Sequence, residues 1–133
     1  MEGIEMAYGF ETDKSKYVIP KKTLNFSASG GLVESWAAPF NYISANAYIN
    51  GGTIEMLMKF AQSAFTAKEG RMLKIREPYR PGINYAVGLI LTAAKPYTPV
   101  GSIWIGTDGN LEYYMSSVPA AGCYFHIVYP CEA

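Results

Sequence analysis

The sequence is poor in the features that mark several classes of protein. It has two cysteines, one histidine and equal numbers of acidic and basic residues, eleven of each. Balanced charge gives no basis for nucleic acid or an anionic membrane as a partner. No stretch approaches the roughly 18 to 20 apolar residues of a membrane span, and the first ten residues carry acids and no long apolar run, unlike a signal peptide. We therefore expect a protein made in a cytoplasm that binds no nucleic acid and inserts into no membrane.

Cysteine and histidine are too few and too badly spaced for catalysis or a disulfide framework. The single histidine, His126, follows Cys123 by three positions. On a strand their side chains point to opposite faces, which is wrong for a nucleophilic pair. Cys123 and Cys131 lie roughly 26 Å apart along an extended chain, so they could pair only if the chain doubled back. We expect free thiols, with Cys123 in the core and His126 on the surface or facing a partner.

Recognisable catalytic motifs are also missing. The sequence contains no motif of a serine hydrolase, phosphate-binding loop, zinc protease or Cys/His metal site. A glycosidase needs two carboxylates held several ångströms apart. Glu55 and Glu112 are a conceivable pair, but no motif selects them. We expect no enzymatic activity, no cofactor and no metal.

Aromatic and glycine residues are what the sequence has in excess. Half of its 133 residues are hydrophobic, 14% are aromatic, and there are eleven tyrosines and thirteen glycines. This is enough apolar material for the core of one domain. The mixture is more typical of a β-rich, turn-rich domain than of a helical bundle. We interpret residues 1–22 as an N-terminal arm and residues 23–133 as a single domain.

Alternating apolar residues between turn signals predict short strands. The strongest turn signal is Asn50-Gly51-Gly52, and residues 53–60 after it alternate cleanly. An apolar helical stripe fits residues 54–65 too, but the preceding turn favours a hairpin strand. Residues 85–93 are almost continuously apolar, which predicts a strand buried on both faces. The remaining expectations are strands at 24–28, 46–49, 71–75 and 124–129, a hairpin at 102–115, and a loop with short strands at 32–45.

The number and spacing of these strands predict the fold class. Seven or eight short strands with turns every eight to twelve residues are typical of an antiparallel β-sandwich. We therefore expect an all-β protein, a sandwich of jelly-roll kind.

The hairpin SIWIGTDGNLEYY, residues 102–114, can be given a register from its two faces. A two-residue loop would pair Ile105 with Glu112 and put a carboxylate on the apolar face. A three-residue loop pairs Ile105 with Leu111 and leaves that face apolar throughout. Register follows the buried face, so we predict the three-residue loop.

The tip of this hairpin, Thr107-Asp108-Gly109-Asn110, is either a metal-binding loop or a structural turn. A three-residue loop needs a residue with positive φ, and Gly109 supplies it. Asp108 stands where its carboxylate can bond a nearby backbone N–H. A calcium loop requires several acidic residues spaced along it, whereas Asp108 has only the neutral Asn110 as a neighbour. We therefore expect a structural turn.

Aromatic residues remain as candidates for a site. Trp104 and Tyr114 lie on the face of the predicted hairpin opposite the aliphatic one. That face is too apolar for free solvent and implies a ligand or a subunit contact. Trp36 and Tyr42 are further candidates, because exposed aromatic rings can stack on sugars or anchor an interface. The alternative is that these rings make core or oligomer contacts.

Three short segments, in their order along the chain, resemble a known family. They are FTAKEG with the strand after it, EPYRP at residues 77–81, and VGSIWIGTDGNL at residues 100–111. Together they resemble the C-terminal head domain of bacteriophage tail-fibre, baseplate and related virion proteins. In that family a P-x-x-R-P loop precedes a buried strand, and a G-x-I-x-I-x-x-D-G-x-I hairpin precedes the last strand. The resemblance covers roughly residues 50–129.

The resemblance implies a function as well as a fold. It implies a jelly-roll β-sandwich that forms a homotrimer. The homotrimer would have other virion proteins as partners. The protein would sit in the virion, assembled in the host cytoplasm, and would serve particle architecture and attachment to host-surface glycan without catalysis. The alternative is a small bacterial glycan-binding or glycan-active β-sandwich module.

Overall fold

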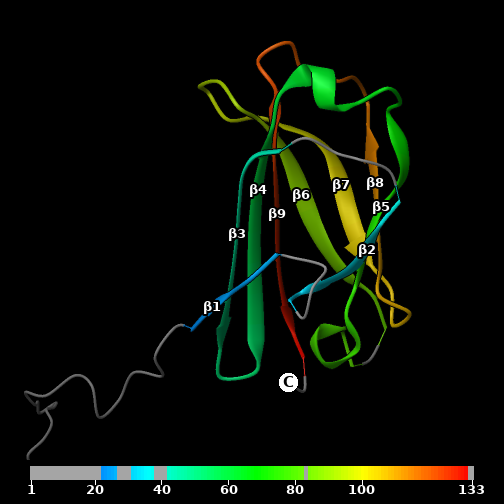
Figure 1. Cartoon of the computed structure of the whole chain (residues 1–133). Helices are drawn as coiled ribbons and strands as arrows, with labels where there is room; N and C mark the ends of the chain where they lie inside the picture. The colour runs from blue at the N-terminus through cyan, green and yellow to red at the C-terminus, as the bar shows by residue number, and fades with distance from the viewer. Residues whose placement is uncertain (1–21, 27–30, 38–41, 83, 132–133) are drawn as a thin grey trace, which may run out of the picture.

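The computed structural model describes residues 22–26, 31–37, 42–82 and 84–131. These residues form nine antiparallel strands and two short 3₁₀ turns (Figure 1). The strands are β1 (Lys22–Leu24), β2 (Val33–Trp36), β3 (Tyr42–Asn50), β4 (Thr53–Phe60), β5 (Glu69–Ile75), β6 (Ala86–Thr92), β7 (Pro99–Ile105), β8 (Asn110–Met115) and β9 (Cys123–Pro130). The 3₁₀ turns are η2 (Gln62–Ala64) and η3 (Glu77–Tyr79).

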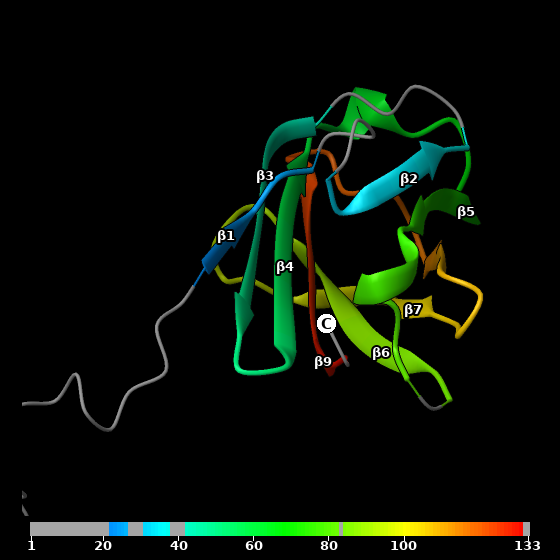
Figure 2. The ribbon, with the colours of Figure 1, turned by 60° about the horizontal axis from the view of Figure 1, so that its bottom comes forward.

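The nine described strands belong to one hydrogen-bonded sheet. Their order is β1-β3-β4-β9-β6-β7-β8-β5-β2. The sheet is curled into a half-barrel: Figure 2 shows it turning from β3 and β4 through β6 to β5 and β2. The expected all-β, antiparallel class is therefore confirmed. The expected jelly-roll sandwich is not, because the described strands join into one curled sheet.

The inside of the curl holds the core, and aromatic rings meet at its centre. The ring of Phe125, on β9, lies 5.0 Å from Phe60 on β4 and 5.8 Å from Tyr113 on β8. Phe65, which follows η2, contacts all three rings. Because β6 and β7 separate β9 from β8 in the sheet, the contact of Phe125 with Tyr113 crosses the curl. Each such pair adds about 0.5 to 1.5 kcal/mol beyond the burial of its area.

Two inward-facing glycines allow neighbouring strands to approach each other closely. A Cβ atom at Gly88, on β6, would overlap the carbonyl oxygen of His126 on β9. A Cβ atom at Gly101, on β7, would overlap the carbonyl oxygen of Tyr114 on β8. Glycine inside a strand often marks a place where another backbone passes this closely. The sheet can therefore curl at β6 and β7 only because these positions carry no side chain.

Most predicted strands are present, with shifted ends. Residues 53–60 form β4, so the helical alternative is wrong, and the hairpin and the last strand lie where they were expected. The strand predicted at 24–28 is wrong in its bounds, because β1 ends at Leu24. The segment 32–45 contains β2 and the start of β3. Of the predicted arm, residues 1–21 lie outside the described residues, and Lys22 already belongs to β1.

The prediction that residues 85–93 are buried on both faces is wrong. Strand β6 does occupy this segment, and its inward residues Ala86 and Ile90 are buried. Its outward residues Val87 and Leu89 are 66% and 49% exposed. The run is continuously apolar, yet none of the described residues covers its outer side.

Substitution of Gly88 tests how far the curl depends on this close approach. Gly88→Ala should lower the free energy of unfolding by roughly 3 kcal/mol, because overpacking a strand contact forces the backbones of β6 and β9 apart. Urea unfolding followed by circular dichroism measures the change. The control is Gly106→Ala, where the nearest atom to the new Cβ is an exposed Asp108 oxygen at 3.1 Å. Equal losses in the two variants would contradict this account.

Candidate functional site

The hairpin between β7 and β8 has the predicted three-residue loop. Ile105 pairs with Leu111 and Ile103 with Tyr113, as inferred from the faces. Gly109 has φ of 88°, the left-handed conformation that a glycine adopts at little steric cost. Its own backbone N–H donates to the Gly106 carbonyl at 2.9 Å and closes the turn.

Asp108 braces this turn. Its Oδ1 accepts a hydrogen bond from the Asn110 backbone N–H at 3.0 Å, and its Oδ2 accepts one from the Asn110 side-chain amide at 2.9 Å. The backbone bond is the main reason why the pKa of Asp108 lies below its ordinary value. Both oxygens are thus engaged within the turn. Elsewhere too, the described residues contain no group of three or more His, Cys, Asp or Glu side chains that could hold a metal ion.

The loop EPYRP and the Asp-Gly hairpin, two segments of the resemblance, contact each other. Arg80 Nε donates to the Ile75 carbonyl at 2.8 Å, and the Ile75 N–H donates to the Gly109 carbonyl at 2.7 Å. A Cβ atom at Gly109 would lie 2.5 Å from Arg80 Nε. The Arg80 guanidinium also pairs with Glu34 on β2 at 3.0 Å. The motif residues therefore form a structural joint.

The four aromatic candidates form two separate groups. On the hairpin, Trp104 is half-buried and its indole N–H donates to Glu112 at 2.9 Å, while Tyr114 is exposed. Trp36, on β2, stacks on Tyr42, on β3, with ring centres 6.0 Å apart. Because β2 and β3 stand near opposite ends of the strand order, this stack links the two ends of the sheet. No single site contains all four rings.

The conceivable glycosidase pair is contradicted by the strand order. Glu55 lies on β4 and Glu112 on β8, four strand spacings apart, or about 19 Å along the sheet. Paired glycosidase carboxylates lie within about 10 Å of each other. Each carboxylate also has another partner, since Glu55 Oε2 lies 3.0 Å from His126 Nε2 and Glu112 accepts the Trp104 N–H.

The outer face of the sheet is unexpectedly apolar at its centre. His126 on β9 pairs with Leu57 on one side and Leu89 on the other. Val128 and Val87 stand two residues further along the same faces of β9 and β6. We call Leu57, Val87, Leu89 and Val128 the outer patch; their exposed fractions run from 38% to 66%. An exposed antiparallel face normally carries polar residues, so this patch marks a candidate contact surface.

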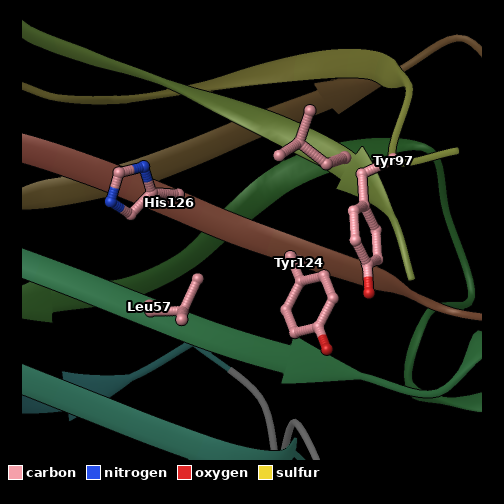
Figure 3. Close-up of a pocket in the computed structure, with 5 residues that line it drawn as sticks. Leu57, Tyr97, Tyr124 and His126 are labelled. Carbon is pink, nitrogen blue, oxygen red and sulfur yellow. The ribbon is translucent and has the colours of Figure 1, made fainter. Parts of the chain in front are cut away.

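A shallow hollow lies at one end of the outer patch (Figure 3). Its volume is about 420 Å³, and we call it the tyrosine cup. Its lining residues are Leu57, Leu91, Tyr97, Tyr124 and His126. The rings of Tyr97 and Tyr124 are 6.0 Å apart and meet at 72°, which makes a corner. Lys59 Nζ lies 5.6 Å from the centre of the Tyr124 ring.

Cys123 has the environment of a core residue, as predicted. It is fully buried, and both it and Cys131 are free thiols. Burial raises the pKa of the Cys123 thiol to about 12, so almost none is the reactive thiolate near neutral pH. His126 lies on the opposite face of β9, beside Glu55. The two residues cannot act as a catalytic pair.

Comparison of the chain with known protein families, with curated proteins and with solved structures finds no match. No helix in the described part of the chain has the length and apolar character to cross a membrane.

Sequence reasoning missed the two surfaces that the fold creates. The outer patch could not be predicted, because a continuous apolar run has the same sequence pattern whether its second face is buried or exposed. The tyrosine cup combines β4, β9, β6 and the loop after β6, which only the sheet order brings together. Its one sequence signal was the expected placement of His126 on the surface or facing a partner.

The buried thiol predicts a loss of stability at high pH. Below about pH 9, the ordinary thiol pKa, both folded and unfolded chains keep the Cys123 proton. Above it only the unfolded chain loses the proton, so the free energy of unfolding falls as pH rises. Between pH 8 and pH 10 this group alone should remove about 1 kcal/mol. Urea unfolding of wild type and Cys123→Ala at both pH values measures it; an equal drop in both proteins would contradict the assignment.

Proposed function

We propose that the protein is a non-catalytic structural and attachment module of a bacteriophage virion that works as a homo-oligomer. It serves as the head domain of a tail fibre, baseplate or head fibre, contacts other virion proteins, and attaches to host-surface glycan. In this proposal the outer patch lies between subunits, and the protein is located in the virion after assembly in the host cytoplasm.

The observation that carries the proposal is the bare outer patch. Val87, Leu89 and Val128, at the middle of the sheet, are each about half or more exposed. Full burial of such a side chain contributes about 1.5 to 3 kcal/mol. Several of them per subunit, repeated around a symmetric assembly, are a substantial driving force for self-association.

The resemblance to phage head domains is the basis for three parts of the proposal. These are the number of subunits, three, the location in the virion, and the likeness to a jelly-roll fold. The joint between Arg80 and Gly109 supports the resemblance, because the EPYRP loop and the Asp-Gly hairpin of this chain contact each other directly. Such contact gives a physical reason for these two segments to occur together.

The second candidate is a small bacterial glycan-binding or glycan-active module. The tyrosine cup favours the binding form of this alternative, because aromatic walls beside polar groups are typical of ligand sites. Glu55 and Glu112, the conceivable carboxylate pair of the hydrolytic form, lie on strands four spacings apart, which supports that form less. A monomer that binds glycan would point to this alternative.

Light scattering tests the proposed self-association. At about 100 μM, well above the dissociation constant of a specific complex, the wild-type protein should have three times the mass of one chain. Val87→Lys should reduce it to a monomer, because the new ammonium would be buried without a partner. Folding should survive, since the Val87 side chain is already exposed to solvent.

A matched substitution controls for the added charge. Thr107→Lys places the same ammonium on the exposed tip of the hairpin, away from the outer patch, and should leave the mass unchanged. A wild-type protein that remains monomeric at this concentration would refute the oligomer and, with it, the proposed role of the patch.

A further inference from the structure

We propose that the tyrosine cup is a subsite for one pyranose ring of a neutral glycan. The inference deepens the proposed function and rests on it for the biological setting, but its argument comes from the cup itself. Tyr97 and Tyr124 form the walls, Leu57 and Leu91 supply apolar surface, and His126 supplies a polar group (Figure 3). Glu55, beside His126, and Lys59, over the Tyr124 ring, add two charged groups next to this lining.

The two tyrosine rings match the shape of a sugar. A pyranose has a flat patch of C–H groups on one face and an edge that carries further C–H groups and hydroxyls. Polarised C–H groups are attracted to the electron-rich face of an aromatic ring. With the Tyr97 and Tyr124 rings at 72°, a sugar can lie on one ring while its edge contacts the other. Two coplanar aromatic rings would contact only the flat face of the sugar and not its edge.

Hydrogen-bonding groups stand where the hydroxyls of that sugar would point. The phenol oxygens of Tyr97 and Tyr124 lie at the same side of the cup (Figure 3). At the other end, Nε2 of His126 is held by Glu55, while Nδ1 has no hydrogen-bond partner in the described part of the chain. Lys59 stands over the Tyr124 ring and can donate from its ammonium. The cup therefore offers donors and acceptors on both sides of its apolar surface.

The size and charge of the cup favour a neutral sugar over other ligands. About 420 Å³ falls within the range of small-ligand pockets, and an open hollow of this size accepts one ring while the rest of a chain stays outside. Lys59 and Glu55 carry opposite charges, so neither a strongly acidic nor a strongly basic ligand is favoured. A lipid chain would find an apolar surface but would leave the polar groups of His126 and Lys59 unused.

The position of the tyrosine cup would leave it open to a sugar when subunits associate through the outer patch. It shares only Leu57 with the outer patch, and Tyr97 stands on the loop beyond β6. Association through Val87, Leu89 and Val128 would therefore leave the cup at the border of the interface, open to solvent. Several weak subsites on one particle bind a repeating polysaccharide far more tightly than one subsite does.

NMR titration with methyl glycosides of glucose, galactose and N-acetylglucosamine tests the proposal. At least one should shift amide resonances around Tyr97, Tyr124 and His126, with a dissociation constant on the order of 1 mM, as expected for one small ring. Tyr97→Ala should weaken this binding about tenfold or more; its side chain is exposed on a loop, so the fold should not change. Tyr85→Ala, which removes a more exposed tyrosine near the hairpin tip, should bind like wild type.

The outcomes separate this inference from the proposed function. If none of the three glycosides shifts these resonances at about 50 mM, or if Tyr97→Ala binds as tightly as wild type, the cup is not a sugar subsite, whatever the oligomeric state. If wild type is a monomer but binds sugar in the cup, the subsite stands and the virion oligomer falls. The monomeric Val87→Lys variant should keep the wild-type affinity per chain.

Discussion

The contact of aromatic rings across the curl is the interaction on which the rest of the structure depends. Phe125 and Tyr113 come from strands separated by two others, and Phe65 lies against both. Once these rings meet, the side of the sheet that faces inward is decided for every strand, because side chains alternate. Val87 and Leu89 must then point outward. The outer patch is therefore a consequence of the core, and within the described part of the chain nothing covers it.

The joint at Arg80 has a similar role at one end of the curl. One guanidinium bonds the Ile75 carbonyl, pairs with Glu34 and packs on Gly109. It thus connects the last strand in the sheet order, β2, to the hairpin that closes β7 and β8. Only glycine leaves room for this packing. The Asp108-Gly109 turn thus has a second role besides closing the hairpin, because Arg80 from another loop packs against it.

Local features of the fold were predictable from the sequence, and distant ones were not. The register of the hairpin followed from keeping Ile105 and Leu111 on one apolar face, because only a few residues separate its strands. The faces of the last strand followed from alternation, with Cys123 inside and His126 outside. The sheet order places β9 between β4 and β6, and no local pattern encodes a pairing across so much chain. For that reason the sandwich expectation is not confirmed, and the residues of the tyrosine cup could not be brought together from the sequence.

The outer patch and the tyrosine cup differ in what their residues offer, and this difference argues for different partners. The patch consists of aliphatic side chains, which gain from burial against another apolar surface but recognise no polar group. The cup adds two angled rings, an imidazole held by Glu55 and an ammonium, which can recognise a ligand with both apolar and hydroxyl faces. The two surfaces adjoin along β6 and β9 but have only Leu57 in common, so a partner that covers Val87 and Val128 can leave Tyr97 and Tyr124 uncovered. One curled sheet can therefore present an assembly surface and a ligand surface on the same outer face.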